Sequence, residues 1–96
     1  MTKTHLLGIE VTLHLYSVQT LKEKRRILRS ILDRSHHKYK VTNAEVGELD
    51  SLSRSKLAFA IVSNNSKLAE KVLQKVINSI DILSEVEIVQ VDWLEL

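Results

Sequence analysis

The sequence predicts an α+β fold with the element order strand, helix, strand, strand, helix, strand. Three observations predict it: residues 5–15 alternate in polarity, two later segments have helical periodicity, and residues 56–63 form a short apolar run. Two strand–helix units joined by a hairpin give the ferredoxin-like βαββαβ arrangement, a four-stranded antiparallel sheet with two helices on one face. We expect residues 1–96 to form this fold as a single domain.

The first two elements are a half-buried strand and a capped helix. Within residues 5–15, aliphatic side chains occupy every second position from Leu7 to Leu15, and glycine or polar residues lie between them. The helix begins at the TLKE sequence, where the Thr20 hydroxyl can accept from the Glu23 amide, as in a capping box. Lys24 interrupts the apolar stripe of this helix, which we expect to end near residues 36–38.

Four further elements follow, with a polar connection between two of the strands. We expect a strand over residues 39–46, a connection over 47–55 and a central strand over 56–63. A helix follows, with apolar positions from 68 to 80, and then a last strand over 85–96. The central strand is apolar on both faces, and Asn64, Asn65 and Ser66 can cap the second helix. The alternation of the last strand slips near Val89, which indicates a bulge.

Positive charge is concentrated in one segment. The whole chain has a formal net charge of +2, whereas residues 20–40 contain eight lysines and arginines and only two acids. Such a segment favours an anionic partner. Our candidate nucleic-acid contacts follow the start of the first helix: Lys22, Lys24, Arg25, Arg26 and Arg29. An ordinary solvated helix face is the open alternative.

The predicted topology brings the start of the first helix next to the end of the second strand. The cations Lys22, Lys24 and Arg25 can then approach three acids of the AEVGELD segment: Glu45, Glu48 and Asp50. Two interpretations stay open. Either these acids neutralise the helix start through salt bridges, or the cations and the helix amides hold an anion together.

The sheet face without helices is a second candidate surface. If Phe59 points towards the helices, then Ala58, Ala60 and Val62 point away from them. Small apolar residues on an open face favour a homodimer, formed through that face or through an edge strand. We also place Trp93 at this interface, against the alternative that it caps the core at the sheet edge.

The sequence does not favour catalysis, a metal or a membrane. It has no Cys, no cluster of His and carboxylates at ligand spacing, and no Gly-rich phosphate loop. No serine has an evident base at a meaningful spacing. We therefore expect a non-enzymatic protein without cofactor or metal. With no signal peptide and no apolar run near the ~20 residues of a membrane span, we expect it in the cytoplasm.

Three segments resemble a known family. LKEKRR in the first helix, AEVG at the end of the second strand and AIVSN in the central strand resemble the YlxP-like family over essentially the whole chain. The resemblance implies a small cytoplasmic ferredoxin-like protein of unknown function, without established catalytic residues. Members are often encoded beside genes for translation initiation and ribosome-binding factors, which suggests ribosome maturation or RNA. The chain departs from the family pattern at YSVQT, where Pro-Gly is common, and at Glu48, where Asp is common.

We therefore expect a binding module whose basic helix, residues 20–38, contacts RNA or a ribosomal particle. The alternative is a homo-oligomeric, protein-binding adaptor that uses the open sheet face and has no nucleic-acid role. A small-anion site or an enzyme at the charged end is a third and more distant hypothesis.

Overall fold

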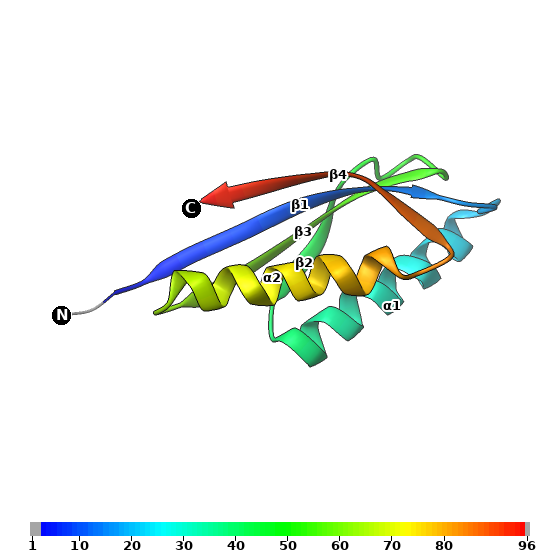
Figure 1. Cartoon of the computed structure of the whole chain (residues 1–96). Coiled ribbons are helices and arrows are strands. Elements are labelled where there is room, and N and C mark those ends of the chain that lie inside the picture. The colour runs from blue at the N-terminus through cyan, green and yellow to red at the C-terminus, as the bar shows by residue number, and fades with distance from the viewer. Residues whose placement is uncertain (1–2, 96) are drawn as a thin grey trace.

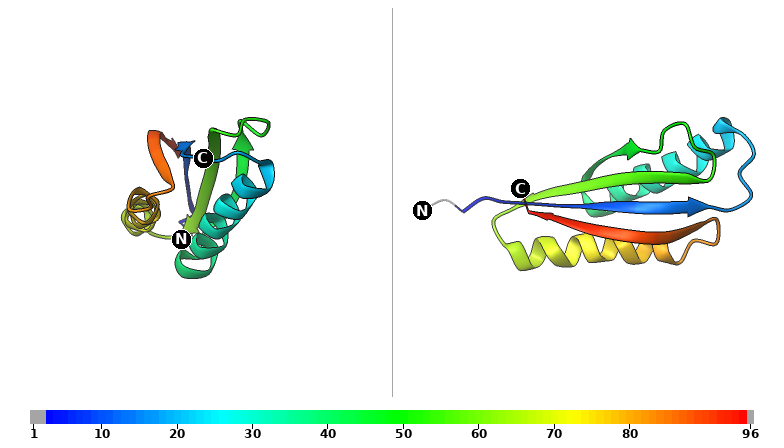
Figure 2. Two further views of the ribbon diagram at one scale, coloured as in Figure 1. Left: turned by 90° about the vertical axis from the view of Figure 1, so that its right-hand side faces the viewer. Right: turned by 90° about the horizontal axis from the view of Figure 1, so that it is seen from above.

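The computed structural model describes residues 3–95 and confirms the predicted order of elements. The elements are β1 (His5–Leu15), α1 (Leu21–Tyr39), β2 (Thr42–Gly47), β3 (Arg54–Ser63), α2 (Ser66–Asp81) and β4 (Val86–Glu95) (Figure 1). The strands form one antiparallel sheet in the order β2-β3-β1-β4. Both helices lie on one face of it, α1 on the β2 side and α2 on the β4 side (Figure 2).

The register of the strands shows which residues face the helices. Ile9 of β1 lies opposite Phe59 of β3 and Trp93 of β4. Directly opposite residues point to the same face of a sheet. Because Ile9 and Phe59 are buried in the core, this is the helix-covered face, and Phe59 points towards the helices as predicted. The intervening residues, such as Ala58 and Ala60, therefore lie on the open face.

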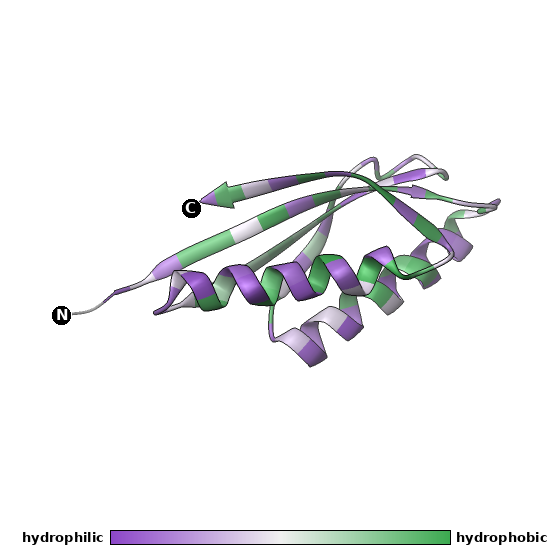
Figure 3. Cartoon of the chain, in the orientation of Figure 1, coloured by the Kyte–Doolittle hydropathy of each residue, from purple (hydrophilic) through white to green (hydrophobic). Residues whose placement is uncertain are grey.

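Both helices are amphipathic and both begin at a side-chain cap. Hydrophobic and hydrophilic residues alternate along them (Figure 3), and the apolar stripes pack onto the sheet. Thr20 Oγ1 accepts from the Glu23 amide at 3.1 Å, and the Glu23 carboxylate accepts from the same hydroxyl at 3.4 Å. At the start of α2, Asn65 Oδ1 accepts from the Leu68 amide at 3.1 Å. The predicted caps are confirmed.

The predicted start of the second strand at residue 39 is wrong, because α1 continues through Tyr39. The helix ends at Lys40, whose φ of 60° lies in the left-handed region and whose amide donates to the His36 carbonyl. A ring nitrogen of His36 lies 3.0 Å from the Val41 carbonyl, and Tyr39 packs against the core. The packing of Tyr39 against the core keeps this residue in the helix, although the polar residues 36–38 before it predict an earlier end.

Irregular pairing occurs in both edge strands. The pairing of β1 with β4 shifts between Thr12 and Leu13, which leaves Val89 as the extra residue and confirms the predicted bulge. The pairing of β2 with β3 shifts between Glu45 and Gly47. At that point a Cβ on Gly47 would lie 3.1 Å from the Lys56 Cβ, so the glycine permits the close approach of the two strands.

The Asn65 cap gives a stability prediction. We expect Asn65→Ala to lower the free energy of unfolding by about 1 kcal/mol, because the Leu68 amide loses its acceptor. Urea denaturation measures the loss. Asn64→Ala is the matched control, since the neighbouring Asn64 is exposed and precedes the cap; it should change stability by less than about 0.5 kcal/mol. Equal effects of the two substitutions would contradict the assignment of the cap.

Candidate functional site

The charged end of the molecule is organised by Lys24, which is buried. This residue lies on the stripe of α1 that faces the sheet, and only 2% of it is exposed. Its Nζ donates to the Glu48 carbonyl at 2.7 Å and to the Ser51 carbonyl at 2.6 Å, and it lies 3.1 Å from Glu45 Oε2. A lysine ammonium has three donors. These three acceptors therefore match its hydrogen-bonding capacity.

The carboxylate of Glu45 completes the network. Its Oε2 also accepts from the hydroxyl of Ser55, a fully buried residue of β3, at 2.8 Å. Glu45 neutralises the Lys24 charge where water has little access, since the Lys24 side chain is 2% exposed; the Glu45 side chain is 23% exposed. One ammonium thus connects α1, β2, β3 and the β2–β3 turn, and we call these five residues (Lys24, Glu45, Glu48, Ser51 and Ser55) the lysine network.

The β2–β3 turn presents its carbonyls to Lys24 through an unusual backbone conformation. Glu48 has a φ of 60°, and its carbonyl also accepts from the Ser51 amide at 3.2 Å. Residues other than glycine rarely adopt this left-handed region, and Asp and Asn tolerate it better than most. What the site uses here is the carbonyl of Glu48.

The structure favours internal neutralisation of the helix start. Lys24 and Glu45 meet as the topology predicted, whereas among residues 3–95 no salt bridge joins Lys22 or Arg25 to Glu48 or Asp50. The expectation that Lys24 is one of the surface cations is wrong. Its position in the apolar stripe is the sequence feature that indicates burial, because a lysine there must either snorkel to water or find acceptors inside the protein.

Four of the five candidate cations are exposed on α1, and we call these four the basic row: Lys22, Arg25, Arg26 and Arg29. Residues three or four apart on a helix are neighbours, so the row forms one continuous ridge. Within residues 3–95, Arg26 alone among the four forms a salt bridge, with Glu85 at 3.9 Å. Both side chains of this pair are more than half exposed, so it contributes little. The row borders a shallow depression of about 590 Å³.

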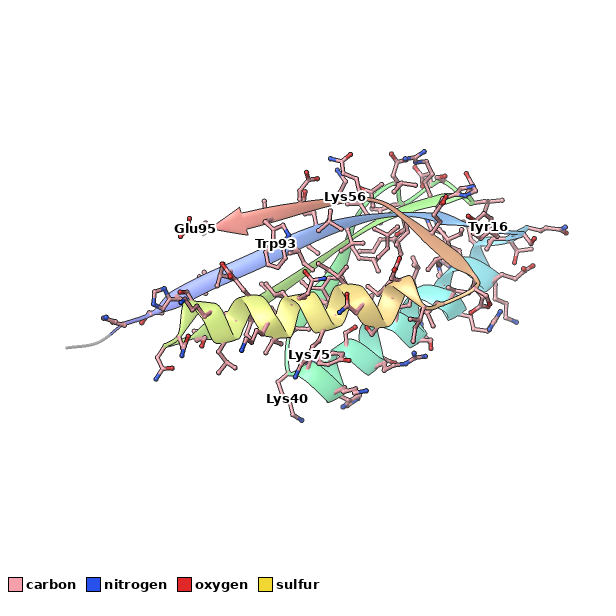
Figure 4. All side chains as sticks on the ribbon, viewed as in Figure 1. Tyr16, Lys40, Lys56, Lys75, Trp93 and Glu95 are labelled. Atoms are coloured by element: carbon pink, nitrogen blue, oxygen red, sulfur yellow. The ribbon has the colours of Figure 1, made fainter. Side chains whose placement is uncertain are left out.

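The open sheet face carries the three other candidate residues. Ala58, Ala60 and Val62 lie there, and Val62 is 66% exposed opposite Leu6, another exposed apolar residue. Trp93, on the edge strand β4, does not share this face with them. Because Trp93 lies opposite Ile9, it shares the helix-covered face and lies beside α2 (Figure 4). The bulge at Val89 produces this placement, since it reverses the parity of the residues that follow it.

Two negative observations concern residues 3–95. They contain no group of three or more His, Cys, Asp or Glu side chains that could hold a metal ion. No helix in this range is long and apolar enough to cross a membrane.

The chain is similar to proteins of unknown function. A family described as "Protein of unknown function (DUF503)" matches residues 7–93. The "Uncharacterized protein YlxP" of Bacillus subtilis (strain 168) is 37% identical over 81 residues, which cover 82% of this chain and 88% of that protein.

A solved structure, a C-terminal segment of the alpha subunit of aIF2 from Pyrococcus abyssi, resembles the fold with a TM-score of 0.57 and 15% identity. The match covers all of this chain and 52% of the solved one, so the chain spans about half of that segment. At this identity the likeness concerns the fold alone.

The lysine network gives a second stability prediction. We expect Lys24→Met to lower the free energy of unfolding by about 3 kcal/mol, because it removes the ammonium that neutralises the Glu45 carboxylate and donates to two carbonyls. The double variant Lys24→Met with Glu45→Gln should recover part of this loss, since it removes the unpaired charge. Urea denaturation measures both values.

The matched control is Lys22→Met, two residues earlier on the exposed side of α1. It should change stability by less than about 0.5 kcal/mol. If Lys24→Met were no more destabilising than this control, Lys24 would not hold the turn.

Proposed function

Because the chain belongs to the DUF503, or YlxP-like, family, whose function is unknown, we propose a function from its surface charges. It is a non-enzymatic cytoplasmic module that binds RNA, including the RNA of a ribosomal particle, through the basic row of α1. The observation that carries this proposal is that these four cations are exposed and almost without acidic partners, whereas Lys24 is fully engaged inside the protein.

The position of the basic row at the start of a helix means that its charges lower the stability of the isolated protein. Lys22 and Arg25 lie in the first turns of α1, where the helix dipole favours acids over cations. From residue 22 to residue 29 the row spans roughly 10 Å along the helix axis. A phosphate backbone relieves the mutual repulsion of these cations and releases its own counterions when they bind. A partner of that kind explains why the charges are gathered there.

The proposed contact involves the RNA backbone and does not depend on base stacking. Sheet-based RNA binders stack bases on aromatic side chains of their central strands. The middle of the open face has no such ring: it carries Gly8, Glu10 and Thr12 on β1 and Ala58 and Ala60 on β3. Phe59 is buried under the helices. We therefore expect binding with little sequence preference and strong dependence on salt.

The open face supports a second candidate function, an adaptor that binds a second copy of itself. The neighbouring side chains of Leu6 and Val62 are 39% and 66% exposed on this face, next to Ala60. Exposed apolar neighbours of this kind often mark an interface between proteins. In this alternative the basic row serves only solubility, and the open face is the working surface.

The RNA proposal predicts a specific loss of binding. We expect Arg25→Glu, Arg26→Glu and Arg29→Glu together to weaken RNA binding about 100-fold or more, since each lost phosphate contact costs on the order of 1 kcal/mol and the new acids repel the backbone. Fluorescence anisotropy with a labelled RNA hairpin measures it. For the wild type, log K should fall with log [salt] with a slope of about −3 to −4 if four phosphates are contacted.

The control variant carries Lys67→Glu, Lys71→Glu and Lys75→Glu on the exposed side of α2, so its net charge changes equally. It should weaken binding only a few-fold, through the general field of the protein. Equal losses in the two triple variants would reject the basic row as the binding surface. Unchanged cosedimentation of the α1 variant with ribosomal particles would reject the ribosomal part of the proposal.

The adaptor alternative predicts a change of oligomeric state. We expect Ala60→Glu to dissociate a wild-type dimer without unfolding it, because it places a charge in the centre of the proposed interface. Light scattering after size-exclusion chromatography gives the mass, and circular dichroism checks the fold. Lys56→Glu, nearer the end of the same strand face, is the milder control. A wild-type monomer at high protein concentration would contradict this alternative.

A further inference from the structure

A groove of about 870 Å³ lies at the end of the molecule opposite to the start of α1. It is bounded by the first half of α2, the beginning of β1 and the end of β4. Leu7 and Trp93 contribute apolar surface to it, and Trp93 lies between β4 and α2 (Figure 4). Although Trp93 is on the helix-covered face, it is 46% exposed, because α2 does not cover this part of the sheet.

The groove lies beside a strand edge that can accept another strand. β4 is an edge strand of ten residues, and its pairing is regular from Gln90 to Glu95, beyond the bulge at Val89. An unpaired edge presents a row of amides and carbonyls to any extended segment. The other edge strand, β2, has six residues, and its pairing shifts before its end. The end of β4 is therefore the more accessible edge.

The charges around this edge select a basic occupant. β4 contains Glu87, Asp92 and Glu95 and no lysine or arginine. Glu70 and Glu95 line the groove together with Lys71, and among residues 3–95 neither acid forms a salt bridge. An exposed indole flanked by carboxylates suits a guanidinium or ammonium group, which the ring face and the acids both attract.

From these observations we infer that the end of β4 and the groove bind an extended, basic segment of a partner protein. The segment adds a strand to residues 90–95, and one of its arginine or lysine side chains lies over Trp93 towards Glu70 and Glu95. Neighbouring strands lie about 4.8 Å apart, so a long side chain opposite Trp93 reaches both the ring and the groove.

A second copy of this chain does not suit the same edge. Antiparallel pairing of β4 with its own copy would bring the three acids of each strand together, with no cation on either strand to balance them. Like charges across paired strands destabilise the pairing. The acids thus exclude self-association at this edge and leave it open to a segment of opposite charge.

The single tryptophan of the chain makes the inference directly testable. The probe is the peptide acetyl-TVRVRVT-amide, and the control probe carries neutral citrulline in place of both arginines. We expect a saturable change in Trp93 fluorescence with the arginine peptide, at least about tenfold weaker binding of the citrulline peptide, and NMR shifts of the amides of residues 90–95.

Two double variants separate the groove from general charge. Glu70→Gln with Glu95→Gln should weaken binding of the arginine peptide at least about tenfold. Asp81→Asn with Glu85→Gln, at the end of α2 and in the turn before β4, lies outside both the groove and β4 and should leave the affinity within about twofold.

Three outcomes would overturn the inference. These are no saturable response up to about 1 mM arginine peptide, equal affinity for the citrulline peptide, and equal effects of the two double variants. A dimer in sedimentation equilibrium, in which every amide of residues 90–95 is protected from hydrogen exchange without peptide, would assign the edge to a second copy instead.

Discussion

The structure depends on one buried cation and its three acceptors. Lys24 lies in the apolar stripe of α1, and its burial is tolerable only because a carboxylate and two turn carbonyls surround its ammonium group. The carbonyls are presented by a turn in which Glu48 holds a left-handed conformation that costs on the order of 1 kcal/mol. The lysine and the turn therefore stabilise each other. Lys24 belongs to the LKEKRR motif and Glu45 to the AEVG motif, so this contact joins two motifs that lie about 20 residues apart in the sequence.

This arrangement divides the cationic segment into an internal and an external part. Lys24 serves the fold, and the basic row remains free for a partner. The proposed RNA surface begins where β1 ends, whereas the groove beside Trp93 lies where β1 begins. A strand of eleven residues separates the two by roughly 35 Å. The two surfaces differ in charge and lie at opposite ends of the molecule (Figure 1), so a basic protein segment and RNA can occupy them at the same time.

Periodicity in the sequence was sufficient for the order of elements, both helix caps and the bulge near Val89, because each depends on local patterns. It was not sufficient where tertiary contacts decide. The last residue of α1, Tyr39, is helical because it packs against the core. Lys24 was identified as an anomaly of its stripe, but the acceptors that bury it come from a turn whose backbone conformation no pattern reveals. The sequence did not give the sheet face of Trp93, because the one-residue bulge at Val89 reverses the parity of the residues that follow it.

The contact between the two motifs depends on the state of the Lys24 ammonium group, which NMR spectroscopy can observe directly. Lysine ammonium protons exposed to water at neutral pH exchange too fast to be detected, whereas three protons held by buried acceptors exchange slowly. We expect one slowly exchanging ammonium signal, assigned to Lys24, with through-space contacts to Ser51 and Glu48. An ammonium group of Lys24 that exchanges as fast as that of Lys22 would show that the lysine lies in water, and the contact between the two motifs would not exist.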